Sequence, residues 1–243
     1  MMQLLCTKIP DQQFTLACEQ AEITLEIIPF IKVSPIVSYE LGKLISAAAL
    51  EPSHVAFTSS NAVEAVHNYL QGLQPEWNIY CTAPATQRTV QQLLPSAVIV
   101  TNASNAEDLA QQMIASGHDQ FLFFCGDQRR AELPDALKSS NISVKEIIVY
   151  KTIATPVTLL KEEYDAIAFF SPSAVTSFFS VNKLPDHTVL FCTGNTTAAA
   201  IDKSLANKVI ISPDPSQAAM AQLIIRHFRE NPVAGNKVRK LNE

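Results

Sequence analysis

The segment AFTSSNAV (residues 56–63) occurs a second time in the chain, as AFFSPSAV (residues 168–175). Two further pairs keep the same order: CTAPAT (81–86) matches CTGNTT (192–197), and SNAEDL (104–109) matches SQAAMA (216–221). A fourth pair aligns residues 4–29 with residues 123–150. Because self-similarity at a fixed step is typical of repeated architecture, the sequence predicts an internal duplication of one α/β unit.

Short β-branched or aromatic runs alternate with helical patterns in both halves. These runs predict strands at residues 3–7, 23–28, 54–58, 78–82, 97–101, 121–126, 144–150, 165–171, 188–193 and 208–212. Helices are expected between many of them, for example at residues 62–70, 107–114 and 218–228. Most of the runs are continuously apolar, which is typical of strands buried on both faces. We therefore expect an α/β protein with two small parallel sheets.

Two segments are predicted to be extended connectors between the halves. Pro29 and Pro35 bracket residues 30–34, and residues 151–155 precede Pro156. A residue before proline is pushed toward extended backbone geometry. The pattern leaves open whether the halves are consecutive or whether the chain crosses over and returns.

Composition excludes several classes of function. The chain has 243 residues, a net charge of -5 and a pI near 5.6, which argues against a duplex nucleic-acid binder. No run approaches the ~20 apolar residues of a membrane span, and the N-terminus is too polar for a signal peptide, so we expect a cytoplasmic protein. The five cysteines lack metal-ligand spacing, which predicts neither a disulfide framework nor a zinc site. Dinucleotide, P-loop and Ser/His/Asp motifs are absent from the sequence.

In every repeat, a predicted strand ends in Ser, Thr or Gly and a helix begins directly after it. In parallel sheets these turns gather at the carboxyl edge, where helix N-termini offer N–H donors to anions. Two such edges would form a clamp for a polyanion without a basic composition; the alternative is that these residues only cap helices. The candidates are Ser59, Ser60, Asn61, Thr86, Gly126, Ser171, Ser173, Gly194, Thr196 and Thr197.

A few charged and aromatic residues could complete such a clamp. Arg129 and Arg130 stand at the expected start of a helix, where a cation is disfavoured unless it meets an anion. Lys8 occupies the matching place in the first repeat, and Lys151 lies beside a connector. Tyr150 ends a strand at the entry to that connector, where its phenol could donate a proton to a leaving group. The alternatives are solvated surface cations and a tyrosine that packs under the connector.

Cysteines recur at one position of the repeats: Cys6, Cys81, Cys125 and Cys192 all stand at strand ends. Small buried residues are the expected explanation. The histidines are scattered, and each is interpreted as a surface or packing residue rather than as a base.

Taken in order, the quoted motifs resemble the uroporphyrinogen-III synthase family over nearly the whole chain, to about Phe228. The motifs are FTSSNAV (57–63), GDQRR (126–130) before a Leu-rich helix, VYKT (149–152), FSPSAV (170–175) and GNTTA (194–198). The resemblance implies two flavodoxin-like domains with parallel sheets, joined by a two-stranded connector with a chain crossover. The implied domains are residues 1–32 with 154–243, and residues 33–153.

The resemblance also implies an activity. Members of the family close the linear tetrapyrrole hydroxymethylbilane in the interdomain cleft, with inversion of its last pyrrole ring, and give uroporphyrinogen III. No cofactor or metal is implied, and the protein is expected to be a monomer that contacts hydroxymethylbilane synthase transiently, with no nucleic-acid or membrane partner. The family's proposed hydroxyl contributors fall on Tyr150, Thr86 and Thr197. Tyr150 would help to protonate the departing hydroxyl, and the serine, threonine and asparagine side chains at the turns would bind acetate and propionate groups.

Three departures from the family pattern leave a second hypothesis open. Lys8 stands where many members carry Arg, Ala83 replaces a usual Gly, and a Gly common before the second strand is missing near Ala21. The alternative function is that of a non-catalytic tetrapyrrole-binding or regulatory homologue. A third possibility is a two-domain binding protein for another small molecule. Residues 235–243 are expected to be a disordered tail.

Overall fold

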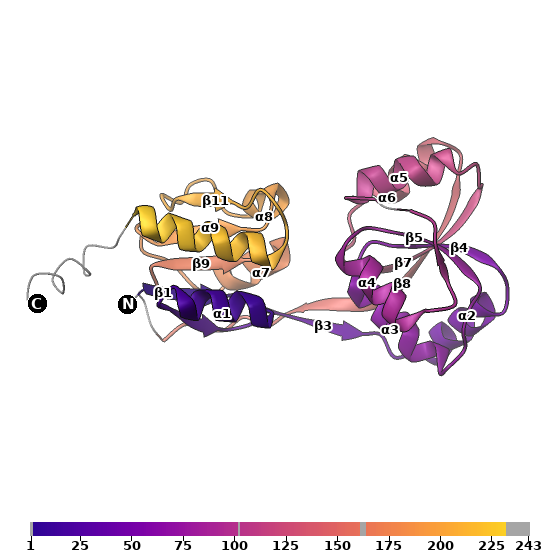
Figure 1. The fold of residues 1–243 in the computed structure, drawn as a ribbon, viewed down its shortest axis with the longest axis horizontal. Coiled ribbons are helices and arrows are strands. Elements are labelled where there is room, and N and C mark those ends of the chain that lie inside the picture. Colours follow the sequence, from indigo (N-terminus) through magenta and orange to yellow (C-terminus); the bar gives the residue numbers. More distant parts are fainter. Residues whose placement is uncertain (1, 102, 161–163, 232–243) are drawn as a thin grey trace, which may run out of the picture. The chain divides into compact units, whose positions relative to one another are not determined.

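The computed structural model describes residues 2–101, 103–160 and 164–231 (Figure 1). The chain divides into two compact units, of which unit 1 comprises Met1–Lys32 and Ile153–Glu243 and unit 2 comprises Val33–Thr152. Each unit is an α/β structure with a largely parallel sheet, so the predicted fold class is confirmed. The tail predicted at residues 235–243 lies outside the described residues.

Unit 1 contains a five-stranded parallel sheet in the order β11-β10-β9-β1-β2. Its elements are β1 (Met2–Cys6), α1 (Gln12–Gln20), β2 (Ile23–Ile27), β9 (Ala166–Phe169), α7 (Pro172–Phe179), β10 (Val189–Cys192), α8 (Asn195–Ala199), β11 (Val209–Ile211) and α9 (Gln217–Glu230). Helices α1 and α9 cover one face (Figure 1). On this face Phe14 and Ile224 pack against Leu4. The other face is covered by α7 through Phe178.

Unit 2 contains a six-stranded sheet in the order β3-β8-β7-β4-β5-β6. Its elements are β3 (Ile31–Pro35), α2 (Tyr39–Ala49), β4 (Ser53–Phe57), α3 (Ser60–Leu70), β5 (Trp77–Cys81), α4 (Ala85–Leu93), β6 (Val98–Ile99), α5 (Ala106–Ala115), β7 (Gln120–Gly126), α6 (Glu132–Ser139) and β8 (Ser143–Ala154). Helices α2, α3 and α4 bury Ile45, Val63 and Val90 on one face. Helices α5 and α6 bury Leu109 and Leu133 on the other.

The two sheets have the same order of corresponding strands. The series β6-β5-β4-β7-β8 in unit 2 matches β11-β10-β9-β1-β2 in unit 1. The agreement supports the predicted duplication. In the chain, however, β1, α1 and β2 of unit 1 come before unit 2, and the remainder of unit 1 follows it. Unit 2 is therefore inserted into unit 1.

All the predicted strands are present, but the two connectors differ from the prediction. Residues 31–35 form the paired strand β3, and β8 continues through the predicted connector as far as Ala154. The Ile36 N–H donates to the Val149 carbonyl at 2.9 Å, and the Thr155 N–H donates to the Phe30 carbonyl at 2.9 Å, so the two segments run antiparallel. The proline flanks predict extended backbone correctly, but this pairing joins residues that are distant in sequence.

Candidate functional site

Each sheet has a topological switch point, where strands on one side follow one another in one direction along the sheet and strands on the other side follow in the opposite direction. In unit 2 it lies between β4 and β7, and in unit 1 between β9 and β1. Ligands of open α/β sheets bind at the carboxyl ends of the strands beside such a point. The predicted residues of unit 2 that follow or end strands at this edge are Ser59, Ser60, Asn61, Thr86, Gly126, Arg129 and Arg130. In unit 1 they are Lys8, Ser171, Ser173, Gly194, Thr196 and Thr197. Tyr150 and Lys151 lie within β8, where it passes the end of β7.

Two predicted serines are helix caps. The Ser59 Oγ accepts from the Asn61 N–H at 3.3 Å at the start of α3. The Ser171 Oγ accepts from the Ala174 N–H at 3.2 Å at the start of α7. Capping of this kind engages a lone pair of the hydroxyl, so the O–H remains able to donate to a ligand. The predicted capping is confirmed for Ser59 and Ser171, whereas α4, α6 and α8 begin without a side-chain cap.

The two predicted threonines are more buried than a direct substrate contact requires. Thr86 is 4% exposed and Thr197 is 3% exposed. The Thr86 hydroxyl lies 3.3 Å from the Thr82 hydroxyl, and the Thr197 hydroxyl lies 3.5 Å from the Thr193 hydroxyl. Thr82 and Thr193 are half-buried and therefore more accessible than the residues that were predicted. The repeat CTAPAT/CTGNTT contains this signal, because both strand ends carry a threonine four residues before the predicted one.

The ring of Tyr150 lies directly over Gly126. A Cβ built on Gly126 would be 2.4 Å from Cζ of Tyr150 and 2.7 Å from its hydroxyl oxygen. Only a glycine leaves room for the ring at this distance. Gly126 ends β7 and Tyr150 is its partner on β8, so the phenol is held at the carboxyl edge of the sheet.

A β-bulge changes the direction of the Tyr150 side chain. Cys125 is opposite Ile148, whereas Gly126 is opposite Tyr150, so β8 contains one extra residue at this point. Side chains of a regular strand alternate between the faces of the sheet. Here both Val149 and Tyr150 pack against the same core cluster, beside α2, α3 and α4. Bulges next to active sites commonly redirect a side chain in this way.

The arginines do not begin a helix, contrary to the prediction. Helix α6 starts at Glu132, and Arg129 and Arg130 lie exposed in the preceding loop. The first turn of α6 carries Glu132 and Asp135 instead, which the helix dipole favours. The Arg129 guanidinium is paired with the Glu146 carboxylate of β8. The sequence gives no signal for Glu146, because this pairing depends on the register of β8 against β7.

The cations near the two edges have different surroundings. The Lys8 Nζ lies 5.3 Å from the centroid of the Phe170 ring, which holds it beside the end of β9. Thr7 strengthens this corner, since its buried hydroxyl donates to the Ala168 carbonyl at 2.8 Å. Lys151 is exposed and follows Tyr150 on β8. Successive side chains of a strand alternate, so Lys151 leaves the strand on the face opposite Tyr150.

The cysteines at the strand ends are buried thiols. Burial raises the pKa of Cys6 and Cys192 to about 12, and that of Cys81 and Cys125 to about 11. A thiol with such a pKa is a poor nucleophile, in agreement with the packing role expected from the sequence. Within residues 2–101, 103–160 and 164–231, no three His, Cys, Asp or Glu side chains are grouped so that they could hold a metal ion.

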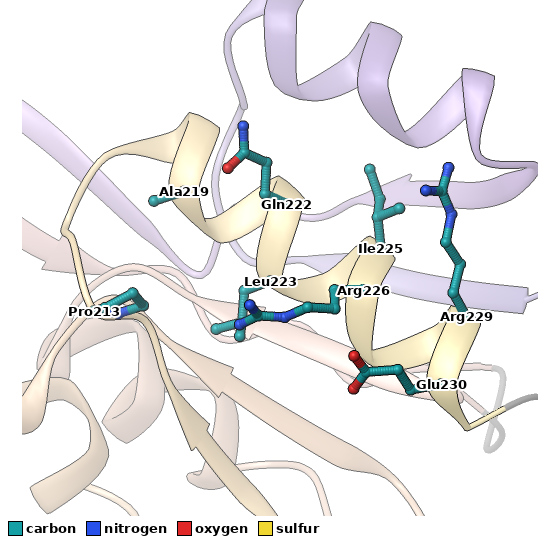
Figure 2. Close-up of a pocket in the computed structure, with 8 residues that line it drawn as sticks. All are labelled: Pro213, Ala219, Gln222, Leu223, Ile225, Arg226, Arg229 and Glu230. Carbon is teal, nitrogen blue, oxygen red and sulfur yellow. The ribbon is translucent and has the colours of Figure 1, made fainter.

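A groove of about 670 Å³ lies away from the predicted residues, along α9 (Figure 2). Its lining comes from Pro213, Ala219, Gln222, Leu223, Ile225, Arg226, Arg229 and Glu230. Arg226 and Arg229 extend from the helix in different directions, so they do not converge on one anion (Figure 2). In the part of the chain that is described, no helix combines the length and apolar character needed to cross a membrane.

Comparison with known proteins relates this arrangement to a family. A family model described as uroporphyrinogen-III synthase HemD matches residues 12–222. The uroporphyrinogen-III synthetase of Helicobacter pylori is similar, with a TM-score of 0.68 and 15% identity over 93% of this chain and 100% of that chain. A mutant uroporphyrinogen III synthase of Thermus thermophilus has a TM-score of 0.62 and 16% identity over 95% and 100% of the respective chains.

The search of curated proteins gave no match. At these identities the solved structures show a common fold, and the family model covers most of the chain. The chain belongs to the uroporphyrinogen-III synthase family of tetrapyrrole biosynthesis.

Proposed function

We propose that the protein cyclises hydroxymethylbilane to uroporphyrinogen III, with inversion of the last pyrrole ring and without a cofactor. Membership of the family supports this reaction. The observation that carries the proposal furthest is the placement of Tyr150, whose ring is fixed over Gly126 at the carboxyl edge of unit 2. A phenol held in this way is a proton donor at the position where ligands of such sheets bind.

In the proposed reaction Tyr150 acts on the leaving group. The C–O bond of the terminal hydroxymethyl group breaks, the phenol supplies a proton to the departing oxygen, and the pyrrole N–H releases one, so that water leaves and an azafulvene forms. The far ring then attacks this azafulvene through its substituted carbon. The resulting spiro intermediate fragments and recloses with the last ring inverted. The proton released by the pyrrole N–H returns to the phenolate of Tyr150, and the proton lost from the last ring when the macrocycle closes restores the pyrrole N–H.

Orientation of the substrate is the main task of the remaining residues. The bilane carries eight carboxylates in the family reaction, and it also closes unaided to the wrong isomer. We propose that Ser59, Ser60 and Asn61, with Arg129 and Arg130, bind carboxylates at the edge of unit 2. Lys8, Ser171, Ser173, Gly194 and Thr196 do so at the edge of unit 1. Fixing reacting groups in a productive geometry accounts for several kcal/mol in well-positioned systems.

We propose different roles for the two members of each threonine pair, Thr82 with Thr86 and Thr193 with Thr197. Thr82 and Thr193 offer the more accessible hydroxyls, and the buried Thr86 and Thr197 orient them across 3.3 and 3.5 Å. Lys151 is retained as a cation near the edge of unit 2. The protein is proposed to act as a cytoplasmic monomer that receives its substrate from hydroxymethylbilane synthase.

The reaction is tested by a coupled assay in which hydroxymethylbilane is generated in place. The products are oxidised to porphyrins, and isomers I and III are separated. Isomer III in excess over a protein-free control is expected, and Tyr150→Phe should lower its rate of formation. Tyr39→Phe is the matched control, because Tyr39 is 74% exposed at the start of α2 and its ring lies beside Lys43 rather than over Gly126.

Isomer I alone, from protein shown to be folded by circular dichroism, would overturn the synthase proposal. Binding of the bilane without formation of isomer III would identify a non-catalytic tetrapyrrole-binding homologue. Failure to bind a polycarboxylated pyrrole would indicate another class of ligand.

A further inference from the structure

The loop between β7 and α6 is tied to β8 on both sides of Lys151, the residue that follows Tyr150. The Asp127 N–H donates to the Tyr150 carbonyl at 3.1 Å. The Asp127 Oδ1 accepts from the Thr152 N–H at 2.9 Å. A third contact runs from the Gln128 Nε2 to the Thr152 carbonyl at 3.1 Å. One residue, Asp127, therefore binds the main chain of β8 at two successive peptide groups next to Tyr150.

These contacts take the place of main-chain pairing between β7 and β8 beyond the end of β7. β7 stops at Gly126, whereas β8 continues to Ala154. Residues two apart in a strand present their main-chain groups to the same side, so the Tyr150 carbonyl and the Thr152 N–H both face the missing continuation of β7. The opposite side of β8 is occupied, since the Val149 carbonyl accepts from the Ile36 N–H. Asp127 supplies the donor and the acceptor that β7 no longer offers.

The charge of Asp127 also indicates a role in holding β8 rather than in binding the substrate. Asp127 is exposed and stands beside Arg129 and Arg130, at an edge proposed to bind carboxylates. A carboxylate at this place repels an anionic substrate, so a role in substrate binding does not account for it. Its contact with Thr152 does account for it.

We propose that Asp127 is a positioning residue for Tyr150, holding the bulged segment of β8 so that the phenol keeps its place over Gly126. The inference rests on the proposed function of Tyr150. Within the described structure, Asp127 contacts the β8 main chain on both sides of Lys151, whereas the Tyr150 ring lies over Gly126. It acts on the reaction only through Tyr150.

The test compares Asp127→Ala with Asp127→Asn in the isomer assay. Asp127→Ala is expected to lower kcat for isomer III about tenfold and to leave KM within about twofold, because loss of such a contact misplaces a catalytic group without removing a substrate contact. Asp127→Asn should restore most of kcat, since the amide oxygen can still accept from the Thr152 N–H. In a Tyr150→Phe background, Asp127→Ala should have no further effect on kcat.

Asp202→Ala is the matched control. Asp202 also accepts a main-chain N–H, from Ser204 at 2.9 Å, in a loop of unit 1. Its kcat should match that of the wild type. The inference is overturned if Asp127→Ala leaves kcat unchanged, if it lowers kcat equally in the Tyr150→Phe background, or if Asp127→Asn is as impaired as Asp127→Ala.

Amide hydrogen exchange gives a readout that does not need activity. The Thr152 amide should exchange faster in Asp127→Ala than in the wild type and in Asp127→Asn, and unchanged exchange would overturn the inference. If the wild type itself forms no excess of isomer III, the proposed function fails. The exchange experiment still decides whether Asp127 holds β8.

Discussion

At the scale of single residues, Gly126 and Tyr150 depend on each other. Gly126→Ala would place a Cβ 2.4 Å from Cζ of Tyr150, so the ring must move. We expect loss of most isomer III formation and a decrease of about 1–3 kcal/mol in the free energy of unfolding, as for other overpacked sites. Denaturant unfolding and the isomer assay measure the two effects.

The stability control for this prediction is Gly194→Ala. Gly194 has a φ of 173°, which is extended backbone, and nothing lies within 4 Å of the position that its Cβ would take. Its unfolding free energy should therefore stay near that of the wild type. Equal destabilisation of the two variants would contradict the assigned contact between Gly126 and Tyr150.

The sequence predicts which strand ends carry functional groups better than it predicts individual contacts. Ser59 and Ser171 are recognisable as caps because capping is local in the chain. The burial of Thr86 and the ion pair of Arg129 with Glu146 are not recognisable. Both depend on how strands and helices pack, and no local pattern encodes that.

At the scale of elements, the start of β4 carries a pH-sensitive contact. The rings of His54 and His118 are stacked, with centroids 3.6 Å apart. Burial, and secondarily the nearby His118, lower the pKa of His54 below its usual value of 6.5. The unfolded chain therefore binds the His54 proton at a higher pH than the folded chain does. The contribution of neutral His54 to the free energy of unfolding is complete above pH 6.5 and is lost as the pH falls.

The expected result is a denaturation midpoint of unit 2 that decreases as the pH falls below 6.5. His54→Asn should flatten this dependence, because the site no longer titrates. His67→Asn, on α3, is the control and should keep the wild-type slope. The midpoint is followed by fluorescence of Trp77, which is buried in unit 2, because His227 of unit 1 also has a lowered pKa. A flat profile in the wild type would contradict the prediction.

The elements themselves were largely predictable. Continuous apolar runs indicate the parallel strands, because both faces of these sheets are covered by helices. The pairing of β3 with β8 and the bulge at Tyr150 were not predictable, since register is set by contacts between distant segments.

At the scale of the whole molecule, the two units have separate hydrophobic cores. The cores of unit 2 and those of unit 1 share no residue among those described. The single tryptophan, Trp77, lies in a core of unit 2 and reports on that unit alone. Ile167 is fully buried in unit 1.

Ile167→Ala is therefore expected to destabilise unit 1 by about 2–5 kcal/mol. The transition followed by far-ultraviolet circular dichroism should broaden or split in urea, while the Trp77 fluorescence transition keeps its midpoint. The reciprocal variant Val66→Ala, in the core of unit 2, should shift the fluorescence transition. A shift of the Trp77 midpoint in Ile167→Ala would show that the units unfold together.

The insertion of unit 2 into unit 1 also sets an order of events during synthesis on the ribosome. β1 is a central strand of its sheet, between β2 and β9, yet β9 begins at Ala166. The first segment of unit 1 must therefore wait, with the apolar Leu4 and Leu5 unshielded by their final neighbours, while all of unit 2 is translated. Unit 2 is continuous in sequence and can fold as it emerges. The nascent chain thus completes its inner unit first and closes the outer one only after β9 has left the exit tunnel.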